Sequence, residues 1–224
     1  MEWGIMDEQG YVIFLQKNKK PLGVIQRYTA GVRHFETYLA EHGKTLEEAS
    51  PDDIRQGSGD FLALAMYYEC LGNDRLCAAA HAAFSAKNYA TLKLSEFMGI
   101  QPETIHKLKA FGIITAEQML SAGRTPTGRA ALARETDISI EEILELVKLS
   151  DQARIGGHKR VRARLYHDAG LDTLDKIAAL KPEEVCRKLD EYIRQSGFNG
   201  IPPTPREAAN SVRMARYLPR MVEY

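Results

Sequence analysis

One spacing recurs in this chain and limits what it can fold into. Two glycines and a threonine return in the same order 58 residues later: Gly99, Gly112 and Thr115, then Gly157, Gly170 and Thr173. An amphipathic segment lies between the two glycines of each copy, at Pro102–Lys109 and at Arg160–Asp168. Because glycine adopts positive φ without steric cost, each copy predicts a turn, a helix, a glycine cap and a second helix. The alternatives are coincidence and a purely structural repeat.

A short helix, a glycine-bearing hairpin and a second helix make up the helix-hairpin-helix motif. In proteins that use this motif, backbone N–H groups at a helix N-terminus contact a nucleic-acid phosphate. The repeat therefore makes nucleic acid the first class of ligand to consider.

The charge distribution favours the second copy. The chain has 30 basic and 30 acidic residues, but residues 151–224 carry 14 basic against 10 acidic ones. Five of these cations fall in one acid-free stretch around the second turn: Arg154, Lys159, Arg160, Arg162 and Arg164. Such runs are often only solvated helix faces. Here the run coincides with the predicted phosphate-facing element, which favours a contact with nucleic acid.

The composition indicates a cytoplasmic globular protein. The chain has 224 residues, of which 44% are hydrophobic, and no apolar run approaches the roughly 20 residues that span a bilayer. We expect no signal peptide and no contact with a membrane. Its three cysteines, Cys70, Cys77 and Cys186, are odd in number and form no C-x-x-C pair, so neither a disulfide framework nor a thiolate metal site is indicated. We also expect no cofactor.

Apolar residues recur at helical spacing along most of the chain, and no segment alternates with a period of two. The sequence therefore predicts an all-α fold. Thr45–Glu48 and Ser50–Asp53 both have the pattern of a helix start, so we expect a short helix after each. We place the domain boundary after residue 90.

Residues of about 14–90, in the domain 1–90, resemble the helical core-binding domain of tyrosine recombinases and phage integrases. The stretches that carry this resemblance are Phe14–Leu15, Ile25–Tyr28, Val32–Leu39 and Ser50–Ile54. In that family the domain clamps duplex DNA from one side. The resemblance implies phosphate contacts by five cations, Lys17, Lys19, Lys20, Arg27 and Arg33. Alternatively, they only solvate an ordinary bundle.

We expect no catalysis. A tyrosine recombinase needs an H-x-x-R pair beside the scissile phosphate, and none of the six histidines has an arginine three residues later. Lys159 and Asp172 superficially mimic the lysine and aspartate of a DNA glycosylase. Little chain remains, however, to build a base-flipping pocket.

Residues 91–224 resemble an uncharacterised family of tandem helix-hairpin-helix proteins. The stretches that carry this resemblance are Gly99–Pro102, Leu108–Ile113, Gly128–Ala133, Ile155–Gly157, Asp168–Leu174 and Ala215–Arg220. The second glycine of the typical hairpin is replaced by Gln101 in the first copy and by Lys159 in the second, and Ile100 becomes His158. We therefore interpret the first hairpin as structural, and the second as the better candidate for DNA contact.

These observations predict a non-catalytic, largely sequence-tolerant DNA-binding protein for duplex or branched DNA, with no small-molecule substrate. The candidate contacts in the hairpin domain are Gly99, Gln101 and Lys107 in the first copy and Gly156, Gly157, His158, Lys159, Arg160, Arg162 and Arg164 in the second. The alternative is a protein-interaction scaffold that has kept both modules and no longer binds the ligand, with a protein partner or a second copy of the chain bound instead.

Overall fold

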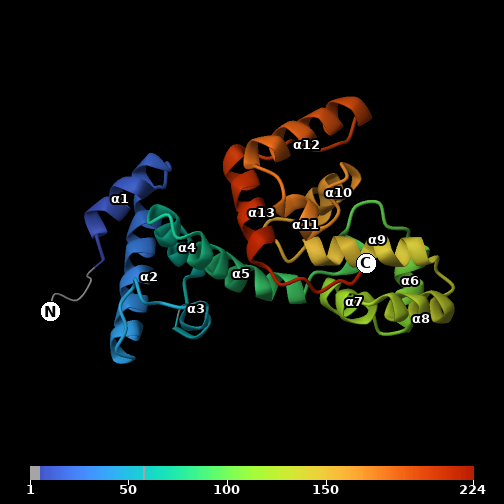
Figure 1. Ribbon diagram of the computed structural model, residues 1–224, viewed down its shortest axis with the longest axis horizontal. Coiled ribbons are helices and arrows are strands. Elements are labelled where there is room, and N and C mark those ends of the chain that lie inside the picture. Colours follow the sequence, from blue (N-terminus) through green and yellow to red (C-terminus); the bar gives the residue numbers. More distant parts are fainter. Residues whose placement is uncertain (1–5, 58) are drawn as a thin grey trace. The chain divides into compact units, whose positions relative to one another are not determined.

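The computed structural model describes residues 6–57 and 59–224, and Figure 1 shows its helices in chain order. Within these residues the chain forms thirteen α-helices and one 3-10 helix, with no β-strand beyond an isolated bridge between Lys93 and Thr115. The predicted all-α fold is confirmed. Among the described helices, none has both the length and the apolar character that crossing a bilayer requires. Packing divides the chain into unit 1, which ends at Phe84, and unit 2, which begins at Ser85.

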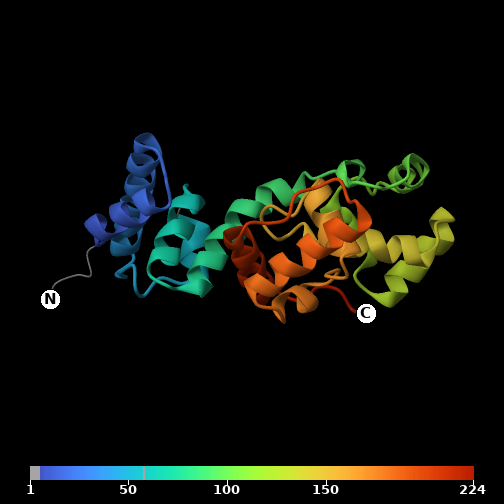
Figure 2. The same cartoon turned by 90° about the horizontal axis from the view of Figure 1, so that it is seen from above.

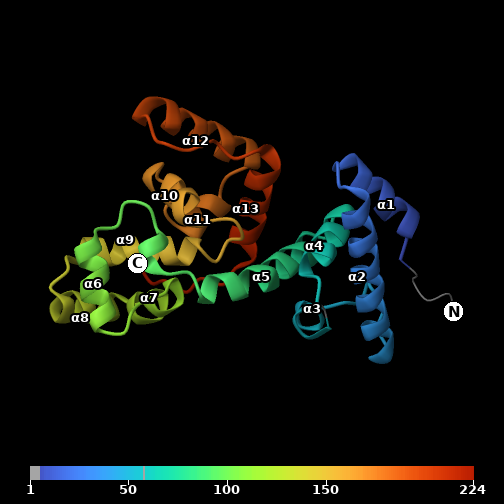
Figure 3. The ribbon, with the colours of Figure 1, turned by 180° about the vertical axis from the view of Figure 1, so that it is seen from behind.

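Unit 1 is built on one long helix. Its helices are α1 (Glu8–Lys17), α2 (Leu22–Glu41), α3 (Pro51–Gly57), α4 (Phe61–Cys70) and the first part of α5 (Asp74–Ala90). In Figure 3, α1, α3 and α4 lie along α2. The inner face of α2 carries Val32, Phe35 and Leu39, which are completely buried because they recur at helical spacing. Tyr11 joins α1 to α4 by donating its hydroxyl proton to the carbonyl of Ala63, 2.8 Å away.

One predicted helix of unit 1 is absent. Thr45–Glu48 forms a bend, although the backbone N–H of Thr45 donates to the Glu48 carboxylate at 3.0 Å as the pattern predicts. The helix does not continue because Ser50, two residues further on, starts α3 and hydrogen bonds to Asp53. Pro51 also disfavours helical geometry in the residue before it.

Unit 2 contains the repeat, and the repeat is longer than the two glycine turns. The first copy comprises α6 (Pro102–Ala110), α7 (Ala116–Gly123), α8 (Pro126–Thr136) and α9 (Ile140–Gln152). The second comprises α10 (Arg160–Asp168), α11 (Leu174–Ala178), α12 (Pro182–Ser196) and α13 (Pro205–Tyr217). In both copies the second and third helices pack against the fourth, so α9 and α13 are the central helices of their copies (Figures 1 and 2).

The predicted local geometry is present in both copies. Gly99 and Gly157 have φ of +83° and +91°, and Gly112 and Gly170 have φ of +78° and +79°. Threonine caps the following helix in each copy, with Thr115 on α7 and Thr173 on α11. We refer to the residues around Gly99 and Gly157 as the first turn and the second turn.

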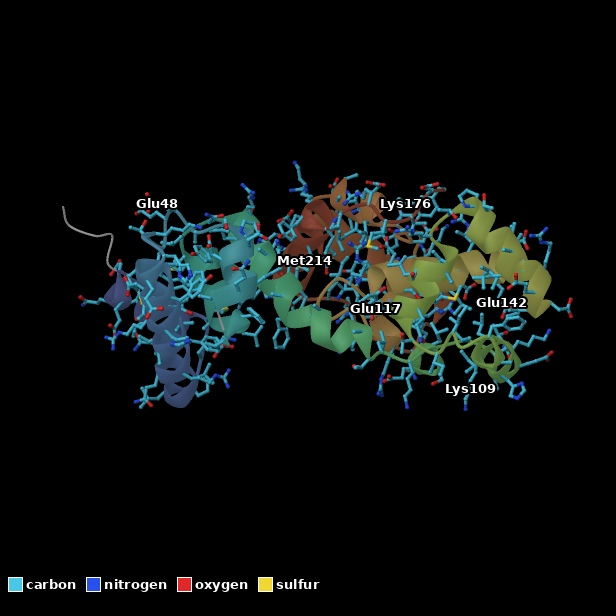
Figure 4. The ribbon with its side chains drawn as sticks, turned by 90° about the horizontal axis from the view of Figure 1, so that it is seen from below. Glu48, Lys109, Glu117, Glu142, Lys176 and Met214 are labelled. Atoms are coloured by element: carbon cyan, nitrogen blue, oxygen red, sulfur yellow. The ribbon has the colours of Figure 1, made fainter. Side chains whose placement is uncertain are left out.

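Corresponding side chains also meet in the two copies. In the first, Thr104 of α6 donates a hydrogen bond to Glu142 of α9, which is labelled in Figure 4. In the second, Arg162 of α10 pairs with Glu207 of α13, with 3.7 Å between Nη2 and the carboxylate oxygen. Each residue of the second pair occupies the same position in its helix as its counterpart in the first.

Candidate nucleic-acid interface

The second turn leaves the start of α10 open. Lys159 is the N-cap of α10 and makes no capping hydrogen bond with its side chain, whereas Ser139 and Thr204 cap α9 and α13. Nothing lies within 4 Å of the position that a Cβ of Gly157 would occupy. The backbone N–H of Arg162 already donates to the Lys159 carbonyl at 2.8 Å, so the N–H groups of Arg160 and Val161 are the ones that the start of α10 can offer to an anion.

Gly156 and His158 support this turn from the inside. A Cβ on Gly156 would lie 2.6 Å from the hydroxyl oxygen of Ser85, so a larger residue there would displace this hydroxyl. His158 is 2% exposed, and its Nε2 lies 2.9 Å from Oγ of Ser211. Its ring lies against Tyr166, with 4.1 Å between the ring centroids. Burial, helped by the positive charge of Arg162, lowers the pKa of His158 to about 3, so the imidazole is neutral and cannot act as a cation toward phosphate.

Two cations of the second turn remain in contact with solvent. Lys159 is partly exposed, and the Arg160 side chain is 68% exposed. The Arg160 guanidinium lies 2.7 Å from the carboxylate of Glu96. Hydrogen bonds from the Lys93 backbone and from Arg160 hold the pKa of Glu96 below its usual value, so this residue is an anion beside the turn. Such an exposed pair contributes little stability and can be exchanged for another anion.

Two other cations of the acid-free stretch are used inside unit 2. Arg162 donates to the backbone carbonyl of Ile201 at 3.0 Å and lies beside Glu207. Arg154 is buried and forms an ion pair with Asp151, with 2.5 Å between Nη1 and Oδ1. The five cations of the stretch therefore do not form one solvated face.

Arg164 occupies the first turn. Its Nε donates to the carbonyl of Met98 at 2.9 Å, and its two Nη atoms pair with Glu145 at 2.6 Å and Asp168 at 3.2 Å. A Cβ on Gly99 would lie 3.4 Å from Nε of Arg164. The side chain of Arg164 is only 11% exposed. It therefore joins the two copies of the repeat, and we leave it out of the interface.

The other candidates of the first turn are not concentrated at one point. Gln101 is exposed and makes no cap on α6. Lys107 donates to the backbone carbonyl of Asp137 at 2.8 Å and lies 3.5 Å from the carboxylate of Glu103. With Arg164 against Gly99, the first turn already holds a cation of this chain.

The candidate cations of unit 1 lie in two places. Three follow the end of α1 and the turn after it: Lys17, Lys19 and Lys20. Lys17 and Lys19 are exposed and Lys20 is partly exposed. Arg27 and Arg33, on α2, have exposed side chains that form ion pairs with the partly buried Asp60 and with Glu8.

Sequence reasoning missed an apolar notch next to the second turn. The connection between α12 and α13 passes the start of α10, and together they line an open notch of about 420 Å³. It is lined by Lys159, Arg160, Val161, Arg162, Leu165, Gly200 and Ile201. The signal in the sequence is Ile201 followed by two prolines, a pattern that by itself indicates only a break between helices.

The lysine–aspartate pair that mimics a glycosylase is not formed by Lys159. Asp172 pairs instead with Lys148 and with Lys176, which is labelled in Figure 4, each at 2.5 Å. Although burial opposes ionisation, these two hydrogen bonds hold the pKa of Asp172 below its usual value. Within the described residues, no group of three or more His, Cys, Asp or Glu side chains could hold a metal ion.

Comparison with protein-family models gives a match. A protein-family model described as a domain of unknown function (DUF4332) matches residues 98–218, more than half of the chain. The matched stretch begins at the first turn and ends just after α13, so it contains both copies of the repeat. No curated protein and no solved structure matches the chain.

Proposed function

Because this chain belongs to the DUF4332 family, whose function is unknown, we propose its function from its own geometry. The protein binds DNA without catalysis and largely without sequence preference, and the second turn is the principal contact. The observation that supports this proposal most is the open start of α10. Gly157 there has φ of +91°, and Lys159, the N-cap residue, makes no hydrogen bond to the helix with its side chain.

Charge and geometry at this turn match a phosphate. The free N–H groups at the start of α10 can donate to phosphate oxygens, and Lys159 and Arg160 supply positive charge beside them. Contacts of this kind hold the sugar–phosphate backbone and read no base, which is why little sequence preference is expected. The resemblance to helix-hairpin-helix proteins supports the same proposal by analogy.

Unit 1 would add a second contact. Lys17, Lys19 and Lys20 lie within four residues of one another, and they form no ion pair within the described part of the chain. The resemblance to integrase core-binding domains supports a role for them in holding phosphates. Arg27 and Arg33 are weaker candidates than these lysines because a phosphate would have to displace Asp60 or Glu8, as it would have to displace Glu96 at Arg160.

A protein-interaction scaffold is the second candidate function. It is favoured by the number of cations that unit 2 uses internally, since Arg154, Arg162 and Arg164 all bond to groups of the chain itself. The formal net charge of zero also gives no general attraction to DNA.

The test compares two double variants with the same change of charge. Lys159→Gln with Arg160→Gln alters the second turn. The control, Arg187→Gln with Lys188→Gln, alters α12, where the Arg187 side chain is 72% exposed and also paired with a carboxylate. We expect the first variant to weaken DNA binding. The slope of log affinity against log salt should fall by about 0.9 for each phosphate that the variant no longer neutralises.

The control should keep the affinity and the slope of the parent. If both double variants bind DNA equally more weakly, DNA is attracted to cations anywhere on the surface and not to the second turn in particular. If neither variant binds DNA more weakly, the protein-interaction scaffold is favoured. Helical circular dichroism on both variants checks that they are folded.

A further inference from the structure

The apolar notch beside the second turn has a feature that folding does not explain. Ile201 is 76% exposed, more than any other large hydrophobic side chain in the described part of unit 2. Apolar surface left in water is unfavourable by about 25 cal/mol for each Å². An isoleucine held at such a position is therefore a candidate contact for something outside the chain.

The backbone around Ile201 is fixed by its neighbours. The guanidinium of Arg162 donates to the Ile201 carbonyl at 3.0 Å, and Pro202 and Pro203 follow directly. On the other side, a Cβ on Gly200 would lie 2.8 Å from the ring of Phe198, so the glycine leaves room for that ring, and a methyl group of Val161 lies at ordinary contact distance, 3.4 Å. These contacts hold the Ile201 side chain at the mouth of the notch.

The notch combines apolar and cationic groups. Val161, Leu165 and Ile201 make its lining mainly apolar, while Lys159 and Arg160 lie at the same site. A nucleotide has the complementary chemistry, because a flat base is joined to a phosphate anion. The volume of about 420 Å³ is within the range of small-molecule pockets. In uniform duplex DNA each base is paired and stacked, so its face is not accessible to a side chain.

We propose that this notch takes an unpaired base of DNA, so that the protein prefers gapped or single-stranded DNA to uniform duplex. The proposal rests on the proposed function, because it assigns the phosphate of the same nucleotide to the second turn. Ile201, Val161 and Leu165 contact the base, and Lys159 and Arg160 contact the phosphate. An aliphatic contact with the face of a base does not read the base edge that carries the sequence, which agrees with low sequence preference.

The experiment uses the full chain and two DNA probes of equal length. One is a uniform duplex, and the other has a single-stranded gap with 2-aminopurine as one of its unpaired bases. Ile201→Ser removes the apolar contact, and Ile140→Ser is the matched control, since Ile140 is an exposed isoleucine of α9 outside the notch. Affinity and 2-aminopurine emission are measured for each protein.

We expect the parent and Ile140→Ser to bind the gapped probe about tenfold more tightly than the duplex, the ratio that burial of about 55 Å² of apolar surface gives. Ile201→Ser should bind both probes equally, with the duplex affinity of the parent, and should abolish the change in 2-aminopurine emission. A parent that binds both probes equally overturns this inference and leaves the proposed function standing. A parent that binds neither overturns both.

Discussion

Nε2 of His158 lies 2.9 Å from the hydroxyl oxygen of Ser211, and this contact fixes the tautomer of a buried histidine. The Ser211 hydroxyl donates its own proton to the backbone carbonyl of Glu207, also at 2.9 Å. Its oxygen must therefore accept the hydrogen bond from Nε2–H. Nδ1 carries no proton and has no hydrogen-bond partner among the described residues. The second turn is thus supported by a neutral imidazole.

Acid should destabilise unit 2 through His158. Its pKa is lowered to about 3 in the folded chain, mainly by burial, against about 6.5 when unfolded. The unfolded state therefore binds a proton that the folded state excludes, and stability falls as pH decreases from about 6.5 toward 3. The decrease reaches about 2 kcal/mol at pH 5.

This decrease can be measured from urea unfolding at pH 7.5, 6 and 5. His158→Gln keeps a donor for Ser211 but does not titrate, so its stability should change less with pH than that of the parent. The exposed His106, changed to Gln, is the control and should follow the parent. A parent whose stability is the same at pH 7.5 and pH 5 would contradict the assignment.

Arg164 should contribute to stability more than to DNA binding. Arg164→Gln leaves the carboxylate of Glu145 and the carbonyl of Met98 without their donor in a site where the side chain is 11% exposed. We expect the free energy of unfolding to fall by about 2–3 kcal/mol. The control is Arg194→Gln, an exposed arginine paired with Asp190, which should cost less than about 1 kcal/mol. Similar decreases in the free energy of unfolding for the two variants would show that Arg164 does not join the two copies of the repeat.

The sequence predicted the repeated turns well because their geometry is local. Positive φ at Gly99 and Gly157 and a threonine cap after each first helix depend on residues that are neighbours in the chain. The full extent of the repeat was missed because its later helices do not keep the spacing. Pro182 begins α12 56 residues after Pro126 begins α8, and the connections before α9 and α13 differ in length.

The sequence did not predict which arginines of α10 face solvent and which form bonds within unit 2. Arg160 and Arg164 are four residues apart on α10 and have the same charge, which suggested one common face. Their different roles are set by partners 64 and 66 residues away, Glu96 and Met98. Only the packing of α10 on the first copy decides which arginine is covered. The buried polar pair of the second copy also depends on residues far apart in the chain. His158 occupies the position of Ile100 in the first copy, and its hydrogen-bond partner is Ser211 of α13.

Substitution of two glycines by alanine should affect DNA binding differently. Gly157 and Gly170 both have positive φ and open space around them, so Gly157→Ala and Gly170→Ala should each cost about 1–2 kcal/mol of stability through backbone strain alone. Only Gly157 lies next to the open start of α10. Gly157→Ala should therefore weaken DNA binding by its folded fraction, while Gly170→Ala should not. Thermal melting and titration with duplex DNA separate the two effects, and equal affinities would remove the second turn from the interface.

Removing one carboxylate should strengthen DNA binding. Glu96 competes with a phosphate because it is 2.7 Å from the guanidinium of Arg160. Glu96 accepts a hydrogen bond from the Lys93 backbone N–H at 3.1 Å, and Glu96→Gln keeps an acceptor there. The variant releases Arg160 from its ion pair and removes a negative charge that repels phosphate. We expect affinity for duplex DNA to rise by about three- to tenfold at low salt, and the gain to shrink as salt screens the charges. Glu183→Gln, in the first turn of α12, makes the same change of net charge away from the second turn and should leave affinity nearly unchanged. If both variants raise affinity equally, net charge is responsible; if neither does, Arg160 makes no contact with DNA.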